Sequence, residues 1–219
     1  RLEMLIYNGT KTDFMHDTEN DLIETKLYET IKEKMNRTTG LSELNSWRNS
    51  LKEMYITLND FEIPTNVGVA IEYNIPQTSK RIDFMISGYG KNNKGNVIVI
   101  ELKQWERLAA IEGQEDIVET YIGRGNRRVP HPSYQALSYA KFIRNYNEFV
   151  QEQEILLHPC VYLHNYPRQN NDPLDSNQYK NILAQAPAFT YGQREVLRNF
   201  IKSKICKGDN EQTLLEIEH

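Results

Sequence analysis

The feature that most constrains the fold is a change in hydrophobic periodicity near residue 67, from a helical repeat to strict alternation. Three short apolar segments then follow one another, separated by stretches rich in polar residues. Alternation is typical of a strand with one buried face, whereas a continuous β-branched run is typical of a strand buried on both faces. The segments are residues 67–75, 81–87 and 96–103, and their order predicts a three-stranded meander.

Helical periodicity surrounds this meander. Apolar residues recur every three or four positions in residues 18–35, 42–58, 134–150 and 193–206, which predicts four amphipathic helices. Residues 155–163 predict a further strand, whereas residues 106–128 and 165–176 have the composition of polar connections. The expected order is helix, three-strand meander, helix, strand, which is an α/β fold with a mixed central sheet flanked by helices.

The 219 residues are enough for one large domain with extensions. We assign residues 1–40 to an N-terminal helical extension and residues 41–206 to the main domain. Residues 207–219 form a polar tail, which we expect to be weakly ordered and of the kind that links one domain to another.

Composition narrows the possible function only a little. The formal net charge is -4, so the whole-chain charge gives no support for nucleic-acid binding. No apolar run approaches the length that spans a bilayer, and no basic-then-apolar leader is present; we therefore expect no membrane association and a cytoplasmic location. The cysteines and histidines lack metal-ligand spacing, so we interpret His158 and His164 as structural or surface residues.

Three charged residues on the predicted meander suggest phosphodiester chemistry. Glu101 and Lys103 are two positions apart on the third strand, so their side chains point to the same face of the sheet. Asp83 lies on the preceding strand, opposite the apolar positions of that strand. Two carboxylates can hold a divalent ion, and a nearby lysine can orient the attacking water and stabilise developing charge. The alternative is a surface ladder of salt bridges.

The order of elements and these residues resemble the PD-(D/E)XK nuclease superfamily. Its motif places an aspartate on the second strand and Glu-x-Lys on the third, here Asp83 in Arg-Ile-Asp-Phe and Glu101-Leu-Lys103. Ile82 stands where the namesake motif has proline. The resemblance implies a restriction-endonuclease-like core with Asp83 and Glu101 as ligands of Mg²⁺ or Mn²⁺, and Lys103 as the residue that acts on the attacking water.

Four longer segments narrow the resemblance, over roughly residues 40 to 206. They are Ser-Glu-Leu-Asn-Ser-Trp at 42–47, Glu-Tyr-Asn-Ile-Pro-Gln-Thr-Ser-Lys-Arg-Ile-Asp at 72–83, Ile-Glu-Leu-Lys-Gln-Trp at 100–105 and His-Pro-Ser-Tyr-Gln-Ala-Leu-Ser-Tyr-Ala at 131–140. They resemble the nuclease-like N-terminal region of bacterial proteins that carry a Schlafen-type superfamily 1 helicase domain. The sequence contains no Gly-x-x-x-x-Gly-Lys-Ser/Thr phosphate-binding motif, so the expected helicase partner would act from elsewhere, in cis or in trans.

Two further carboxylates are candidates for the same site. Glu43 falls where many members of the superfamily carry a carboxylate on the first core helix, which implies a role in metal binding; the alternative is a charge that favours a helix N-terminus. Glu72 faces away from the apolar positions of its strand. We favour a solvated residue over a further ligand at Glu72.

Gln135 and Tyr139 lie four positions apart on the second core helix and therefore on one helix face. RecB-like nucleases carry such a pair beside the metal site, which implies that Gln135 contacts substrate or a metal-bound water and that Tyr139 contacts the nucleic-acid backbone. Plain helix packing is the alternative. Trp47 and Trp105 are interpreted as core anchors rather than as base-stacking platforms.

Arg124, Arg127 and Arg128 fall within five positions, beside Gly123 and Gly125. A cluster of this kind on a loop before the second core helix can contact phosphates, although a solvated loop accounts for it equally well.

The sequence therefore predicts a divalent-metal-dependent nuclease that hydrolyses DNA, acting as the nuclease module of a helicase-nuclease in defence against foreign DNA or in repair. Two alternatives stay open: a catalytically silent nuclease-fold module that binds nucleic acid or a partner, and a ribonuclease. Strandedness, mode of cutting and sequence specificity leave no readable signal in the chain.

Overall fold

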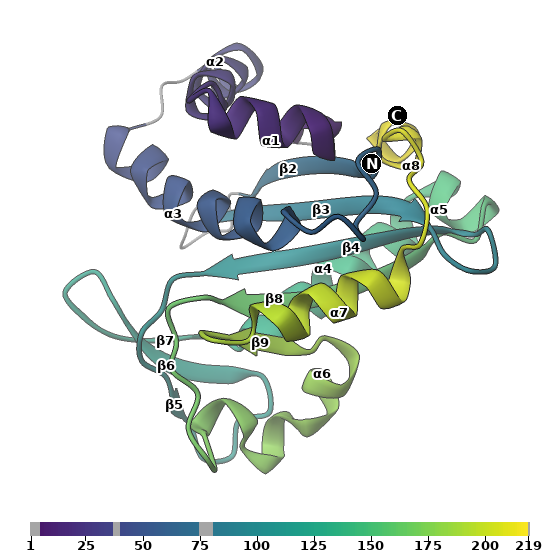
Figure 1. Cartoon of the computed structure of the whole chain (residues 1–219). Helices are drawn as coiled ribbons and strands as arrows, with labels where there is room; N and C mark the ends of the chain where they lie inside the picture. The colour runs from purple at the N-terminus through teal and green to yellow at the C-terminus, as the bar shows by residue number, and fades with distance from the viewer. Residues whose placement is uncertain (1–4, 37–39, 75–80, 219) are drawn as a thin grey trace.

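The computed structural model describes residues 5–36, 40–74 and 81–218. Its centre is a six-stranded sheet with strand order β1-β2-β3-β4-β8-β9 (Figure 1). The first four strands pair antiparallel, whereas β8 pairs with β4, and β9 with β8, in parallel. Helices cover the sheet, so the expected mixed central sheet flanked by helices is confirmed.

The predicted meander is present with nearly the predicted bounds. It consists of β2 (Gly68–Asn74), β3 (Arg81–Tyr89) and β4 (Gly95–Lys103). All three strands are buried on both faces over most of their length, and every described side chain of β4 except that of Lys103 is buried. The end of the first strand near Pro76 lies outside the described residues.

The connection from β4 to the parallel strand β8 (Leu156–Leu163) contains the second core helix, α4 (Pro132–Tyr146). Parallel neighbours need such a crossover, and its helix packs back onto the sheet. The helix predicted over 134–150 is interrupted at Asn147, which caps the short helix α5 (Glu148–Glu152) by accepting a hydrogen bond from the Val150 amide at 3.0 Å.

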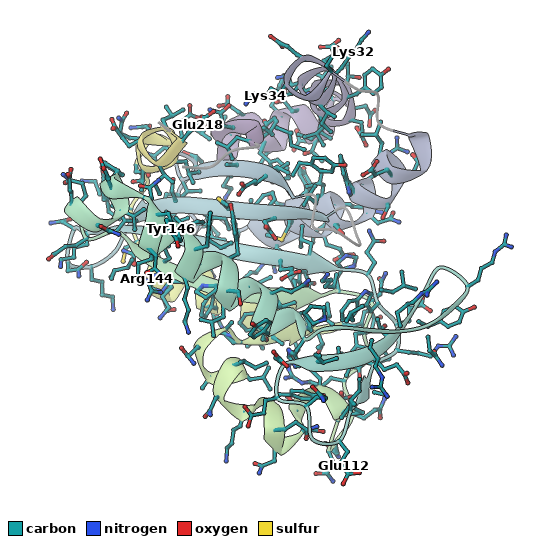
Figure 2. The ribbon with its side chains drawn as sticks, turned by 180° about the vertical axis from the view of Figure 1, so that it is seen from behind. Lys32, Lys34, Glu112, Arg144, Tyr146 and Glu218 are labelled. Carbon is teal, nitrogen blue, oxygen red and sulfur yellow. The ribbon has the colours of Figure 1, made fainter. Side chains whose placement is uncertain are left out.

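The two faces of the sheet are covered by different helices. One face packs against α1 (Lys11–Glu19), α2 (Ile23–Met35), α3 (Leu41–Leu58) and α7 (Arg194–Lys204). The other packs against α4, α5 and α8 (Gln212–Glu218), and in the view from behind α4 crosses this face (Figure 2). The face that carries Asp83 is therefore also a core, and the expectation that it is solvent-facing is wrong.

The segment expected to be a polar connection through Arg128 is instead a second sheet. Its strands are β5 (Ala109–Ala110), β6 (Ile117–Ile122) and β7 (Gly125–Pro130), in antiparallel order β5-β6-β7. Most side chains of β6 and β7 are polar and exposed, so this part of the chain lacks the apolar alternation that predicts a strand. A small core that includes Val118 and Leu137 joins this sheet to α4.

The N-terminal region differs from the predicted helical extension. Residues 18–35 do not form one helix, because α1 ends at Glu19 and α2 begins at Ile23, with Asp21 at a φ of 56° between them. Before α1 lies an unpredicted edge strand, β1 (Leu5–Thr10), which pairs with β2. The extension thus belongs to the same sheet as the meander.

The polar tail is also part of the fold. Its helix α8 packs two buried side chains, Leu214 and Ile217, against the sheet. Lys34 lies 3.8 Å from Glu218, and the two are neighbours in Figure 2. Three apolar residues among many polar ones are a weak helical signal, so local sequence does not predict this contact. The remaining elements are η1 (Pro173–Asp175), η2 (Asn177–Tyr179), α6 (Lys180–Gln185) and β9 (Ala188–Thr190).

His131 generates a prediction about pH. Its buried ring caps α4 by accepting a hydrogen bond from the Ser133 amide at 3.0 Å, and burial lowers its pKa to about 4. The unfolded chain binds a proton near pH 6.5 and the folded chain does not, so stability should fall by up to roughly 1.4 kcal/mol per pH unit between pH 6.5 and 4. We expect the melting temperature of the wild type to drop more between pH 7 and 5 than that of His131→Asn, which keeps a capping acceptor. Equal drops would contradict this account.

Candidate active site

Three carboxylates form a row across the meander. The strand register places Glu72 directly opposite Asp83, and Asp83 directly opposite Glu101. Directly opposed residues of antiparallel strands share a face and have Cβ atoms roughly 5 Å apart. The exposed fractions are 3% for Glu72, 1% for Asp83 and 1% for Glu101. The interpretation of Glu72 as a solvated residue is therefore wrong, and the signal that was available is its place opposite Asp83 on the neighbouring strand.

Lys103 is held beside this row. Its Nζ lies 3.2 Å from Oε1 of Glu101, and its side chain is only 11% exposed. The same ammonium lies 4.8 Å from the centroid of the Trp105 ring, a cation–π distance. A lysine confined between a carboxylate and an indole is a positioned cation rather than part of a solvated ladder, so the packing favours the site over the surface-ladder alternative.

The helix α4 packs against β4 and β8 and carries two polar side chains with buried atoms. Oε1 of Gln135 and the hydroxyl of Tyr139 are buried, and neither has a hydrogen-bond partner among the described residues. Buried polar atoms of this kind normally have a partner, so they mark a place where water or a ligand binds. Helix packing alone explains the apolar neighbours Ala136 and Ala140 but not these two atoms.

The described contact of Glu43 is with a residue on the other face of the sheet from Asp83. It lies in the first turn of α3, and its Oε1 accepts a hydrogen bond from the Tyr73 hydroxyl at 3.0 Å. Tyr73 belongs to the core on the α3 face of the sheet, opposite the face that carries Asp83. A role for Glu43 in binding metal stays a prediction.

The three arginines lie on the β6–β7 hairpin rather than on a loop. Arg124 occupies its two-residue turn after Gly123, whose φ is 67°, and Arg127 and Arg128 are exposed on β7. A positive φ at the first turn position is the geometry in which glycine is favoured in tight hairpins. The hairpin projects from the body of the molecule near the end of β4 (Figure 1).

A cavity of about 750 Å³ lies between α3, the end of β4 and this hairpin. It brings Lys103 and Gln135 together with Arg127 and Arg128, although Arg124 is outside its lining. The cavity therefore joins the positioned lysine of the carboxylate row to two of the arginines predicted to contact nucleic acid. The remaining lining residues are Ser46, Trp47, Ser50, Ile82, Leu102, Gln104, Trp105, Ile122, Gly123, Val129 and Pro130.

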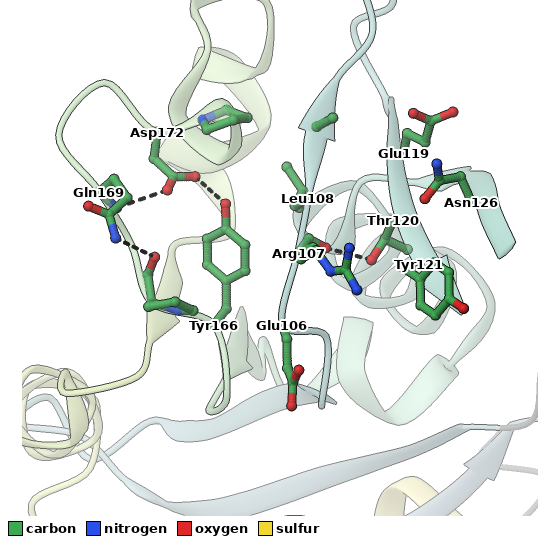
Figure 3. A pocket seen from close by; sticks show the side chains of 13 residues that line it. Glu106, Arg107, Leu108, Glu119, Thr120, Tyr121, Asn126, Tyr166, Gln169 and Asp172 are labelled. Carbon is green, nitrogen blue, oxygen red and sulfur yellow. Dashed lines mark hydrogen bonds between the residues drawn. The ribbon is translucent and has the colours of Figure 1, made fainter. Parts of the chain in front are cut away.

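A second cavity, of about 460 Å³, lies between the β6 strand and the segment after β8 (Figure 3). Its main polar groups already bind one another. Asp172 accepts hydrogen bonds from the Tyr166 hydroxyl at 2.6 Å and from the Gln169 amide at 2.9 Å, and the Thr120 hydroxyl donates to the Arg107 carbonyl at 2.6 Å. These bonds hold the polar segment 165–176 in place. The polar groups that make them already have partners within the protein, so we assign no reaction to this cavity.

The histidines and tryptophans have mostly structural surroundings. Nε2 of His164 lies 3.0 Å from Oγ of Ser50, and Nε2 of His158 lies 2.6 Å from Oδ1 of Asn96, which confirms their structural interpretation. Trp47 is 5% exposed and packs edge-on against Tyr73, as expected of a core anchor. Trp105 also packs against a core, the small one that includes Val118 and Leu137, but it is only half-buried.

The donor set fits a hard divalent cation. Within the described ranges, no group of three or more histidine, cysteine, aspartate or glutamate side chains is arranged to hold an ion together. Magnesium, however, keeps several waters and is commonly bound through one or two carboxylates plus substrate phosphates. The opposed pair Asp83 and Glu101 supplies those oxygens.

Comparison with protein-family models, with curated proteins and with solved structures gave no match. In the part of the chain that the structure describes, no helix is both long and apolar enough to cross a bilayer.

Metal binding by the opposed carboxylates should appear in thermal stability. An ion that binds only the folded state at a hundredfold excess over its Kd adds about 2.7 kcal/mol, or roughly 5 to 10 °C in a domain of this size. We expect Mn²⁺ to raise the melting temperature of the wild type and not that of Glu101→Gln. The matched control is Glu154→Gln, whose carboxylate is 70% exposed and pairs with Lys94. An equal rise in the wild type and Glu101→Gln would remove Glu101 from the ligand set.

Proposed function

We propose that the protein is a divalent-metal-dependent nuclease of the PD-(D/E)XK type that hydrolyses phosphodiester bonds of DNA. The observation that carries the proposal is the juxtaposition of the opposed pair Asp83 and Glu101 with Lys103. Lys103 in turn lines a cavity that is also lined by Arg127 and Arg128. Paired carboxylates, a positioned lysine and phosphate-binding guanidinium groups are what hydrolysis of a phosphodiester requires.

The chain's own residues have distinct tasks in this proposal. Asp83 and Glu101 would hold a Mg²⁺ or Mn²⁺ ion, with Glu72 and Glu43 as candidate further ligands, and the bound ion would supply charge stabilisation at the scissile phosphate. Lys103 is fixed by Glu101 and Trp105, so its ammonium can hold the attacking water and neutralise charge as the new bond forms.

Other residues position the substrate. The buried Oε1 of Gln135 can accept a hydrogen bond from a metal-bound water. The Tyr139 hydroxyl can donate a hydrogen bond to the nucleic-acid backbone. Arg127 and Arg128 supply bidentate donors for phosphate oxygens at the rim of the cavity, and Arg124 extends the positive charge along the hairpin turn.

The resemblance to the nuclease-like region of helicase-linked bacterial proteins extends the proposal to a partner and to a cellular location. A nuclease of this kind acts with a helicase or ATPase in cis or in trans, in the cytoplasm, and serves defence against foreign DNA or repair. These assignments rest on analogy with a family rather than on a residue of the site.

The test of the active site is digestion of DNA and RNA with Mg²⁺ or Mn²⁺. We expect Asp83→Asn and Lys103→Gln to lower the DNA cleavage rate by roughly a hundredfold or more, since such groups stabilise the transition state directly. Asn replaces the buried Asp83 without leaving a cavity. Lys94→Gln, at an exposed salt bridge, is the matched control.

Other outcomes of this assay are equally informative. Cleavage of RNA alone would make the protein a ribonuclease, and nucleic-acid binding without cleavage in either metal would make it a silent binding module. Cleavage at the wild-type rate by a folded Asp83→Asn variant would remove Asp83 from the mechanism.

The arginines generate a separate prediction about salt. Each phosphate contact contributes roughly 0.7 to 0.9 to the slope of log affinity against log salt concentration. We expect the double variant Arg127→Gln/Arg128→Gln to bind DNA more weakly and to lower that slope by about 1.4 to 1.8. Arg144→Gln is the control, because Arg144 is exposed on α4 and lies on the side of the molecule away from the hairpin (Figure 2). An unchanged slope would mean that Arg127 and Arg128 are solvated residues that do not contact phosphates.

A further inference from the structure

We infer that the 750 Å³ cavity beside Lys103 binds an unpaired nucleobase, so that the site takes a single-stranded substrate or one nucleotide unpaired from its partner. This inference deepens the proposed nuclease function and rests on it for the role of the bound strand, but its test is a binding measurement.

The cavity has two unlike walls. Toward α3 it is apolar and aromatic, with Trp47, Ile82 and Leu102, and Trp105 stands where the chain leaves β4. Toward α4 and the hairpin it carries the polar and cationic groups, which are Gln135 and the guanidinium groups of β7, beside apolar residues of the same hairpin. A nucleotide has the same division, because its base is flat and largely apolar on its faces while its phosphate is anionic. Single-stranded nucleic acid is bound by this combination of aromatic platforms and positive charge.

Size and chemistry both argue for an unpaired base. A volume of about 750 Å³ lies in the range of pockets that enclose a small organic ligand. A base inside a duplex has both faces stacked on its neighbours, so it reaches a protein aromatic ring only after leaving the stack. A backbone-reading nuclease site would need no enclosed apolar wall beside its lysine.

Trp105 is the ring best placed to meet the base. Trp47 is almost fully buried against Tyr73, whereas Trp105 is half-buried and lines the cavity. The ammonium of Lys103 lies 4.8 Å from the centroid of the Trp105 ring. A base that contacts this ring therefore carries its own sugar and phosphate close to Lys103, the residue proposed to act on the scissile bond.

The α3 side of the cavity also has a fixed polar edge. The side-chain amide of Gln104 donates to the Ser46 carbonyl, and its nitrogen lies 3.1 Å from Oγ of Ser46 and 3.2 Å from Oγ of Ser50. These bonds orient the amide nitrogen toward α3, which leaves the amide oxygen as the acceptor that a base edge can use.

The hairpin completes the enclosure. Ile122 and Val129 contribute apolar surface from β6 and β7, and the register Ile122 to Gly125 closes the ribbon with a two-residue turn. Ile122 is 37% exposed although it is a large aliphatic residue. Burial of this side chain against a bound base would contribute to affinity.

The experiment is fluorescence titration with a short single-stranded DNA containing one 2-aminopurine, without divalent metal so that no cleavage occurs. We expect the single strand to bind roughly tenfold more tightly than the same DNA paired with its complement, and the fluorescence to change on binding. Trp105→Ala and the cavity-filling variant Ser46→Trp should each weaken single-strand binding by roughly tenfold, since stacking of one base on an aromatic ring has an effect of this size.

Asn45→Trp is the matched control, because Asn45 is exposed on the same helix, next to Ser46, and does not line the cavity. It should bind like the wild type. An abasic version of the oligonucleotide tests the idea without changing the protein, and it should bind about as weakly as the natural strand binds to Trp105→Ala.

Equal affinity for the abasic and natural strands, or tighter binding of the duplex, would overturn the base pocket. Cleavage assays on the same proteins keep the two proposals separate. If the wild type cleaves duplex DNA while neither the Ser46→Trp substitution nor the abasic site changes single-strand affinity, the protein is a nuclease without a base pocket. Loss of single-strand binding in Trp105→Ala supports the pocket even if no metal activates cleavage.

Discussion

The antiparallel register of β2, β3 and β4 is the constraint on which the rest of the site depends. It sets Glu72, Asp83 and Glu101 side by side on one face of the sheet. A shift of one residue between any two of these strands would send one carboxylate to the opposite core, because strand side chains alternate between faces. The apolar residues on both faces fix the register, since such a shift would also bury charge among them. The hydrophobic pattern of the meander thus determines the geometry of the chemistry.

The crossover from β4 to β8 turns this row into an enclosed site. It carries α4 to the side of the sheet that is also covered by α5 and α8, so this face is a core, and Gln135 and Tyr139 contribute buried polar atoms on the same side. Low exposure strengthens electrostatic interactions among the charged groups and makes a compensating cation valuable. The same packing explains why conservative, volume-preserving replacements separate chemistry from folding at these positions.

The β5–β7 sheet is inserted between β4 and α4 and supplies positive charge and a wall to the cavity. It places Arg127 and Arg128 at a cavity that includes Lys103, and it encloses an apolar wall that contains Trp105. A chain with a net charge of -4 can in this way present local positive charge where a phosphate would enter. The hairpin therefore connects the two proposals made for this protein, phosphate binding at the rim and base binding inside.

The sequence by itself determined the meander, the crossover helix and strand, and the positions of Asp83, Glu101 and Lys103, because period-two alternation and a β-branched run are local signals that a strand carries in its own residues. Only the tertiary structure decided that Glu72 is buried opposite Asp83, that residues 106–130 contain a second sheet, and that β1 and α8 belong to the core. Those outcomes depend on contacts with other segments of the chain. Strand β2 pairs with β3, β6 pairs with β7, and Ile217 packs against the sheet. No local pattern encodes such contacts. The cavity has the same origin, since Trp47, Trp105 and Arg127 come from a helix, a strand exit and a hairpin that only folding brings together.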